Sequence, residues 1–94
     1  MIPTIVLEKF PAGRIMITQG AFAELAWDDV SGGLARHILG DWGELGEADR
    51  KRNDDAVERG GCLLSRYVTP SGTSFWITTE HDRSATTILL PDES

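Results

Sequence analysis

Residues 63–91 read LLSRYVTPSGTSFWITTEHDRSATTILLP, and this stretch decides the fold. Three segments within it, 63–69, 73–79 and 86–91, are rich in β-branched and aromatic residues, as strands usually are. Turn chemistry separates them, because Pro-Ser-Gly follows the first segment and a polar loop follows the second. The stretch therefore predicts a three-stranded antiparallel meander.

Large side chains occur on both faces of the middle strand. Trp76 and Thr78 share one face, whereas Phe75 and Ile77 share the other, because the side-chain period of a strand is two. An antiparallel sheet of this kind is covered on both faces, or it uses one face for a partner. The pattern thus leaves a homodimer open as one arrangement.

Upstream of the meander, three segments have helical patterns. Residues 47–59 contain strong helix formers, no proline and a following Gly-Gly pair, which together predict a helix with a clear end. Residues 28–39 carry an apolar stripe that starts at Val30 and repeats every four residues, although two internal glycines weaken it by about 1 kcal/mol each. A shorter helix over 18–26 is capped by Thr18.

The N-terminal region predicts a further pair of strands. The β-rich run TIVLEKF at 4–10 is followed by Pro-Ala-Gly and by RIMIT at 14–18, a pattern typical of a β-hairpin. We therefore expect a single α+β domain over residues 1–94. Its order is an N-terminal β-hairpin, two or three helices and the meander, with the helices packed on one sheet face.

Composition and charge exclude several classes of protein. The formal charge of -6 disfavours broad binding to nucleic acid, which needs an extended basic surface. No apolar run is long enough for a membrane span, and the first residues lack a basic leader, so we expect a cytoplasmic protein. The lone Cys62 can form no internal disulfide and is expected to be a small buried residue.

Two polar segments carry candidate binding residues, each with a structural alternative. Trp42, in the loop 40–47, either plugs the core with its indole N–H paired, or is an exposed contact. Asp49 and Asn53 lie beside the apolar stripe of the helix over 47–59, where they either bond to local backbone or border a pocket.

The turn EHDRS at 80–84 is the densest group of reactive side chains. Its acids and imidazole suit acid–base chemistry and Arg83 suits anion binding, but Asp82 paired with Arg83 is also a means of fixing a turn. The two histidines stand in no metal-ligand motif, so neither a metal nor a cofactor is expected. His37 near a helix C-terminus is expected to satisfy carbonyl groups.

Three segments resemble one family: RHILGDWGELGEADRKRN at 36–53, GCLLSRYVTPSGTSFWITTE at 61–80 and DRSATTILLP at 82–91. The family consists of small uncharacterised bacterial proteins of mobile elements, often labelled plasmid-related proteins. The resemblance implies a setting rather than an activity. The family-like positions either share a cleft between the middle helix and the sheet or form a polar network that fixes the fold; they are Asp41, Trp42, Asp49, Asn53, Trp76, Glu80, Asp82, Arg83 and Thr86.

Small size, acidity and this resemblance favour a non-enzymatic accessory protein of mobile elements that binds a partner protein, such as a host defence or DNA-processing protein. One alternative is a small hydrolase or nuclease-like toxin, with acid–base groups in the turn 80–84 and Arg83 on a phosphate. Another is a module for a small anionic ligand or nucleotide, which Trp42 or Trp76 would stack upon.

Overall fold

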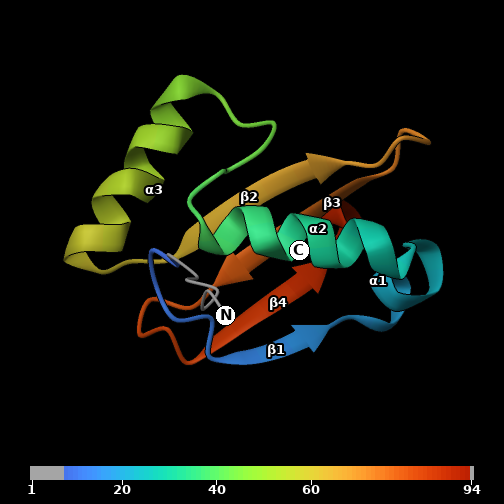
Figure 1. Ribbon diagram of the computed structural model, residues 1–94, viewed down its shortest axis with the longest axis horizontal. Helices are drawn as coiled ribbons and strands as arrows, with labels where there is room; N and C mark the ends of the chain where they lie inside the picture. The colour runs from blue at the N-terminus through green and yellow to red at the C-terminus, as the bar shows by residue number, and fades with distance from the viewer. Residues whose placement is uncertain (1–7, 94) are drawn as a thin grey trace, which may run out of the picture.

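The computed structural model describes residues 8–93 and confirms the α+β class (Figure 1). The helices and strands follow one another as β1 (Arg14–Ile17), α1 (Gln19–Glu24), α2 (Trp27–Ile38), α3 (Glu47–Arg59), β2 (Leu63–Val68), β3 (Ser74–Thr79), β4 (Ala85–Leu89) and the 3₁₀ turn η1 (Pro91–Glu93). No helix within residues 8–93 has the length and apolar character needed to cross a membrane.

The four strands form one mixed sheet in the order β1-β4-β3-β2. The expected meander is confirmed, because β2 pairs antiparallel with β3 and β3 pairs antiparallel with β4. The strand β1 lies parallel to β4, with Ile15 opposite Thr86 and Ile17 opposite Ile88. The sheet thus has two edge strands, β1 and β2.

The structure does not show the expected N-terminal β-hairpin, because β1 pairs with β4 rather than with the residues before it. Residues 4–7 lie outside the described residues, and 8–10 have no strand conformation. The amide of Lys9 instead donates to the carbonyl of Ile38, so this segment lies at the end of α2. β1 finds its partner in β4 at the far end of the chain, where Arg14 N–H donates to Ser84 O.

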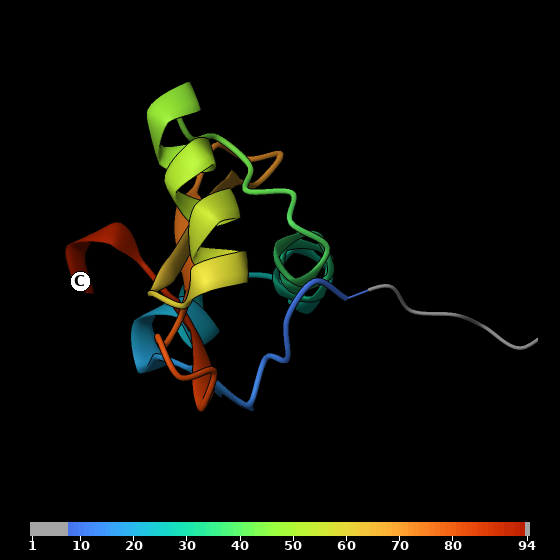
Figure 2. The same cartoon turned by 90° about the vertical axis from the view of Figure 1, so that its left-hand side faces the viewer.

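The helices bury their apolar side chains against one face of the sheet, as expected. The view along the sheet shows α2 standing over this face (Figure 2). Ala21 of α1 and Val30 of α2 pack there with a group of strand residues: Tyr67, Phe75, Ile77 and Ile88. At the other end of α2, Phe10, Trp42 and Leu63 form a second cluster with Ala56 and Val57 of α3.

Of the two glycines within α2, Gly33 has a packing role, whereas a side chain at Gly32 would face open space. A Cβ at Gly33 would lie 2.9 Å from two ring carbons of Phe75. The glycine therefore permits a close approach of the helix to β3, and tertiary packing offsets its poor helix propensity.

Candidate functional site

Trp42 serves as a plug between α2 and α3. Its side chain is 2% exposed, and its indole N–H donates to Asp54 Oδ1 at 2.9 Å. The ring stacks on Phe10 and meets His37 edge-on, with centroids 6.1 and 5.6 Å apart. These contacts correspond to the structural alternative for Trp42, since a buried ring offers no surface to a ligand.

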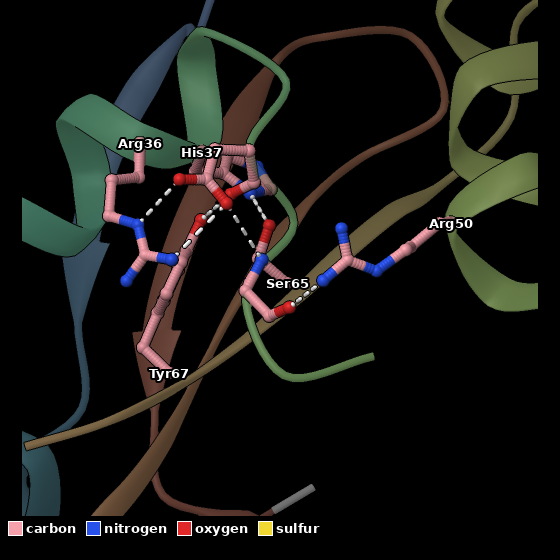
Figure 3. Close-up of polar contacts among 7 residues, drawn as sticks. Arg36, His37, Arg50, Ser65 and Tyr67 are labelled. Atoms are coloured by element: carbon pink, nitrogen blue, oxygen red, sulfur yellow. Dashed lines mark hydrogen bonds and ion pairs between the residues drawn. The ribbon is translucent and has the colours of Figure 1, made fainter. Parts of the chain in front are cut away.

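Asp41 fixes the loop on either side of Trp42. Its carboxylate accepts hydrogen bonds from Arg36 at 2.8 and 3.2 Å and from the amide of Gly43, while its carbonyl accepts from the Tyr67 hydroxyl. Figure 3 shows these contacts together with Arg50, which donates to the carbonyl of Gly43. The Arg36 guanidinium holds the pKa of Asp41 below its usual value. The group is therefore already paired within the chain.

Asn53 ties α3 to the first strand of the meander. Its amide nitrogen donates to the carbonyl of Leu64 at 2.7 Å, and its oxygen accepts from the amide of the same residue at 3.2 Å. Asp49, by contrast, lies on the surface and pairs with Arg52 at 3.2 Å. Of the two alternatives for Asn53, the contacts match a bond to local backbone.

Arg83 acts as a clamp on the backbone around the turn 80–84. Its guanidinium donates to four carbonyl oxygens, those of Ala56, Gly61, Glu80 and His81, at 2.6 to 3.3 Å. The carboxylate of Asp82 does not pair with Arg83 and accepts instead from the amide of Ser84. A phosphate at this guanidinium would have to compete with these bonds.

His37 belongs to a buried polar chain rather than to the helix end. Its Nδ1 lies 2.5 Å from Ser65 Oγ and its Nε2 lies 2.8 Å from Thr79 Oγ1 (Figure 3 draws the first contact). Thr79 contacts Thr86, whose hydroxyl donates to the carbonyl of Ala12. The expectation that His37 satisfies helix carbonyls is therefore wrong.

Burial decides the charge state of this histidine. The ring is 0% exposed, and burial lowers its pKa to about 4, with a further contribution from the positive charge of Arg83. The imidazole is thus neutral at pH 7. A serine and histidine pair with no access to solvent has no route to a substrate, so it stabilises the fold.

The candidate residues do not share one cleft. Asp41, Trp42 and Asn53 secure the loop and α3, whereas Arg83 and Thr86 secure the turn 80–84 and the buried chain of hydroxyls. Trp76 lies on the sheet face opposite α2, where its indole nitrogen is buried with no hydrogen-bond partner among the described residues. A binding role for this set remains a prediction.

An exposed apolar surface lies elsewhere, beside β1. Phe22 and Trp27 are each 74% exposed, and all four residues of β1 are exposed as well. Together with residues of α2 and β4 they form a groove of about 260 Å³, which we call the β1 groove. Its lining consists of Ile15, Met16, Ile17, Phe22, Trp27, Val30, Leu34 and Ile88.

The sequence pattern did not predict this surface. Ala21 of α1 and Leu25 at its end pack against the core, whereas Phe22 faces outward. The signal that was missed is the run of three apolar residues in β1, Ile15 to Ile17, which places apolar side chains on both faces of a short strand.

The two edges of the sheet are treated in opposite ways. At β2, the outward backbone groups of Leu64 bond to Asn53, and those of Arg66 bond to the carbonyl of Trp42 and the amide of Glu44. Gly43 makes this close contact possible, because a Cβ there would collide with the carbonyl of Arg66. The β2 edge is therefore covered from Leu64 to Arg66.

The outer edge of β1 has no such cover within residues 8–93. The amide of Arg14 donates to the carbonyl of Ser84, just before β4, and the amide of Thr18 donates to that of Ile88 in β4. Inward-facing residues alternate with outward-facing ones along a strand, so the amides and carbonyls of Ile15 and Ile17 point outward. Their side chains lie on the α2 side of the sheet, in the β1 groove. An unprotected edge thus runs beside an apolar groove.

Comparison of the chain with family models, with curated proteins and with solved structures found no match in any of the three.

Proposed function

We propose that this protein is a non-enzymatic interaction module that binds an extended segment of a partner protein by adding it as a strand to β1. The observation that carries the proposal is the contrast between the two sheet edges. Proteins ordinarily cover or blunt an edge strand, since free amides and carbonyls invite pairing with another chain. Within residues 8–93, β2 is covered at every outward group of Leu64 and Arg66, whereas the outward groups of Ile15 and Ile17 in β1 have no partner.

The β1 groove supports the same mode of binding. In strand addition, main-chain hydrogen bonds give affinity and pockets for alternate side chains give specificity. The outward backbone groups of Ile15 and Ile17 supply main-chain hydrogen-bonding partners, and the exposed rings of Phe22 and Trp27 line a pocket for side chains. The partner segment would place every second side chain in the groove.

Charge favours a basic partner segment over a second copy of this chain. The formal charge of -6 makes two copies repel each other. Acidic residues also follow the exposed rings in the sequence, Glu24 two positions after Phe22 and Asp28 and Asp29 directly after Trp27. Asp28 and Asp29 line the neighbouring hollow over Tyr67 and Phe75, on the same helix as the groove. An apolar strand flanked by lysine or arginine is therefore the occupant that fits.

The biological setting rests on the resemblance to proteins of mobile elements. On that basis the partner is a protein of the host or of the element, such as a defence or DNA-processing protein, whose basic segments match the acidic chain. The buried position of Trp42, the clamp made by Arg83 and the inaccessible His37 support a binding role over a hydrolase or nucleotide site.

A selection from a library of short random peptides tests this function. We expect the protein to enrich peptides with apolar residues at every second position and basic residues at the ends. The double variant Phe22→Ser, Trp27→Ser should bind them at least about tenfold more weakly, which corresponds to about 1.4 kcal/mol. Both side chains are exposed, so the variant should keep its stability to within about 0.5 kcal/mol.

Leu39→Ser is the control, because Leu39 is an exposed apolar residue at the other end of α2, outside the groove lining. Equal binding by the double variant and by this control would contradict the proposal. Sedimentation of the wild type and of the double variant tests whether a second copy of the chain occupies the groove instead. A wild-type dimer that dissociates in the double variant would assign the β1 groove to a second copy.

A further inference from the structure

Three side chains with metal-binding groups meet at the end of the sheet where β2 begins and β3 ends. The sulfur of Cys62, a carboxylate oxygen of Glu80 and an imidazole nitrogen of His81 all lie within 4.8 Å of one another. All three residues are exposed, which corrects the expectation that Cys62 is buried. Figure 1 shows this end of the sheet far from α1, so the cluster is separate from the β1 groove.

The backbone holds these residues together for a reason visible in the strand register. Leu63 pairs with Thr79, so one step beyond the ladder Cys62 comes to lie opposite Glu80. Residues directly opposite on antiparallel strands have Cβ atoms about 5 Å apart. His81 then follows Glu80 at the start of the turn.

Arg83 fixes the two segments that carry the three groups. Its Nη1 donates to the carbonyl of Gly61 at 2.6 Å, next to Cys62, and to those of Glu80 and His81 at 3.0 and 3.3 Å. The backbone is therefore preorganised, and only side-chain rotations separate the groups from a common centre. Preorganisation of this kind lowers the entropic cost of binding an ion.

We infer that Cys62, Glu80 and His81 bind one zinc ion. Thiolate, imidazole and carboxylate are the three protein ligands of zinc, and a tetrahedral site separates its ligand atoms by about 3.3 to 3.6 Å. Rotation of the exposed side chains closes the remaining distance. Cys62 gives up its thiol proton to solvent on binding, and water fills the fourth position.

The ligand set selects the metal. Magnesium and calcium prefer sites made wholly of oxygen ligands, whereas a thiolate with an imidazole favours zinc among the divalent ions available in cells. The formal charge of -6 adds a general attraction for a cation. The Arg83 guanidinium, the closest opposing charge along the chain, is directed at backbone carbonyls.

The bound ion would join the start of β2 to the turn between β3 and β4. It therefore stabilises the folded chain by mass action, since the three groups do not converge in the unfolded state. The chain spacing of the ligands matches no short motif, which is why the sequence pattern alone excluded a metal.

Titration of the tag-free protein with Co²⁺ and then Zn²⁺ tests the site. We expect one Co²⁺ per chain, a thiolate-to-cobalt charge-transfer band, and displacement by Zn²⁺. Cys62→Ser should abolish the band, and His81→Gln and Glu80→Gln should each raise the dissociation constant at least about tenfold. Glu24→Gln, a change at an exposed acid on α1, should leave the titration unchanged.

A second measurement uses the wild type alone and so does not depend on the folding of variants. Zn²⁺ should slow alkylation of Cys62 at least about tenfold, and a chelator should restore the rate. Alkylation at an unchanged rate would overturn the inference. So would an unaltered dissociation constant in both His81→Gln and Glu80→Gln, or one metal bridging two chains through Cys62.

Discussion

His37 is fully buried among uncharged groups, away from the water that would stabilise a charged imidazolium. Hydroxyls of Ser65 and Thr79 contact its two nitrogens, and the rings of Phe10 and Trp42 enclose it edge-on. No carboxylate contacts the ring among the described residues, and the one charge that acts on it is that of Arg83. Protonation in the folded state is therefore unfavourable, and the pKa falls to about 4.

This burial makes stability depend on pH. The unfolded chain binds a proton at His37 below a pH of about 6.5, whereas the folded chain binds it only near pH 4. The contribution of neutral His37 to the free energy of unfolding is therefore complete above pH 6.5 and is lost as the pH falls toward 4. We expect a loss of about 2 kcal/mol in the free energy of unfolding between pH 7 and pH 5, measured by urea denaturation.

Two variants separate His37 from other groups. His81→Gln, which removes an exposed imidazole, should keep the loss, whereas His37→Gln should remove most of it. A loss of equal size in His37→Gln would contradict the assignment of the pH dependence to this histidine.

At the scale of helices and strands, the sequence predicted correctly those elements whose boundaries depend on residues close together in the chain. The helix formers and terminal glycines of 47–59 predicted α3, Thr18 caps α1 through the amide of Ala21, and the turns of the C-terminal third predicted the meander. These features depend on neighbours in the chain.

The pairing of β1 could not be obtained in this way. The Pro-Ala-Gly turn at 11–13 is equally suited to folding β1 back on the preceding residues or to delivering it to β4. Pairing with β4 depends on residues about seventy positions further along the chain, and periodicity carries no information about it. The exposed β1 groove follows from that pairing, so it was missed as well.

The polar candidates were found but their roles were not distinguishable. Asn53 and Arg83 are the kinds of residue that build binding sites, and here their hydrogen bonds go to the backbone of Leu64 and of Ala56 and Gly61. Whether such a residue binds a ligand or bonds to the chain's own backbone depends on which groups the fold brings next to it, and the sequence pattern does not show these groups.

Proline substitutions in β1 test which of its backbone groups face outward. Met16→Pro removes an amide that belongs to the β4 ladder, so it should cost at least about 1 kcal/mol more than Met16→Ala. Ile15→Pro removes an outward amide and should be about as stable as Ile15→Ala, as urea denaturation would show. The reverse order of stability would mean that the opposite set of amides faces the partner.

In the whole molecule, the two candidate binding sites lie at different places on the sheet. The cluster of Cys62, Glu80 and His81 lies at one end of the sheet, and the β1 groove lies along one edge. Asn53 and the loop after α2 cover Leu64 and Arg66 at the β2 edge, and α2 covers one face of the sheet. Within residues 8–93, the unpaired backbone groups of Ile15 and Ile17 stand beside the exposed rings of Phe22 and Trp27. Binding of an extended segment there would continue the sheet without any change in the core.

Amide hydrogen exchange, residue by residue, on the free protein and on the protein saturated with a selected peptide tests strand addition most directly. The amides of Ile15 and Ile17 should exchange at least about tenfold more slowly in the complex, because they gain hydrogen bonds, while Met16, already bonded to β4, changes less. A peptide that binds and leaves the exchange of Ile15 and Ile17 unchanged would contradict strand addition to β1.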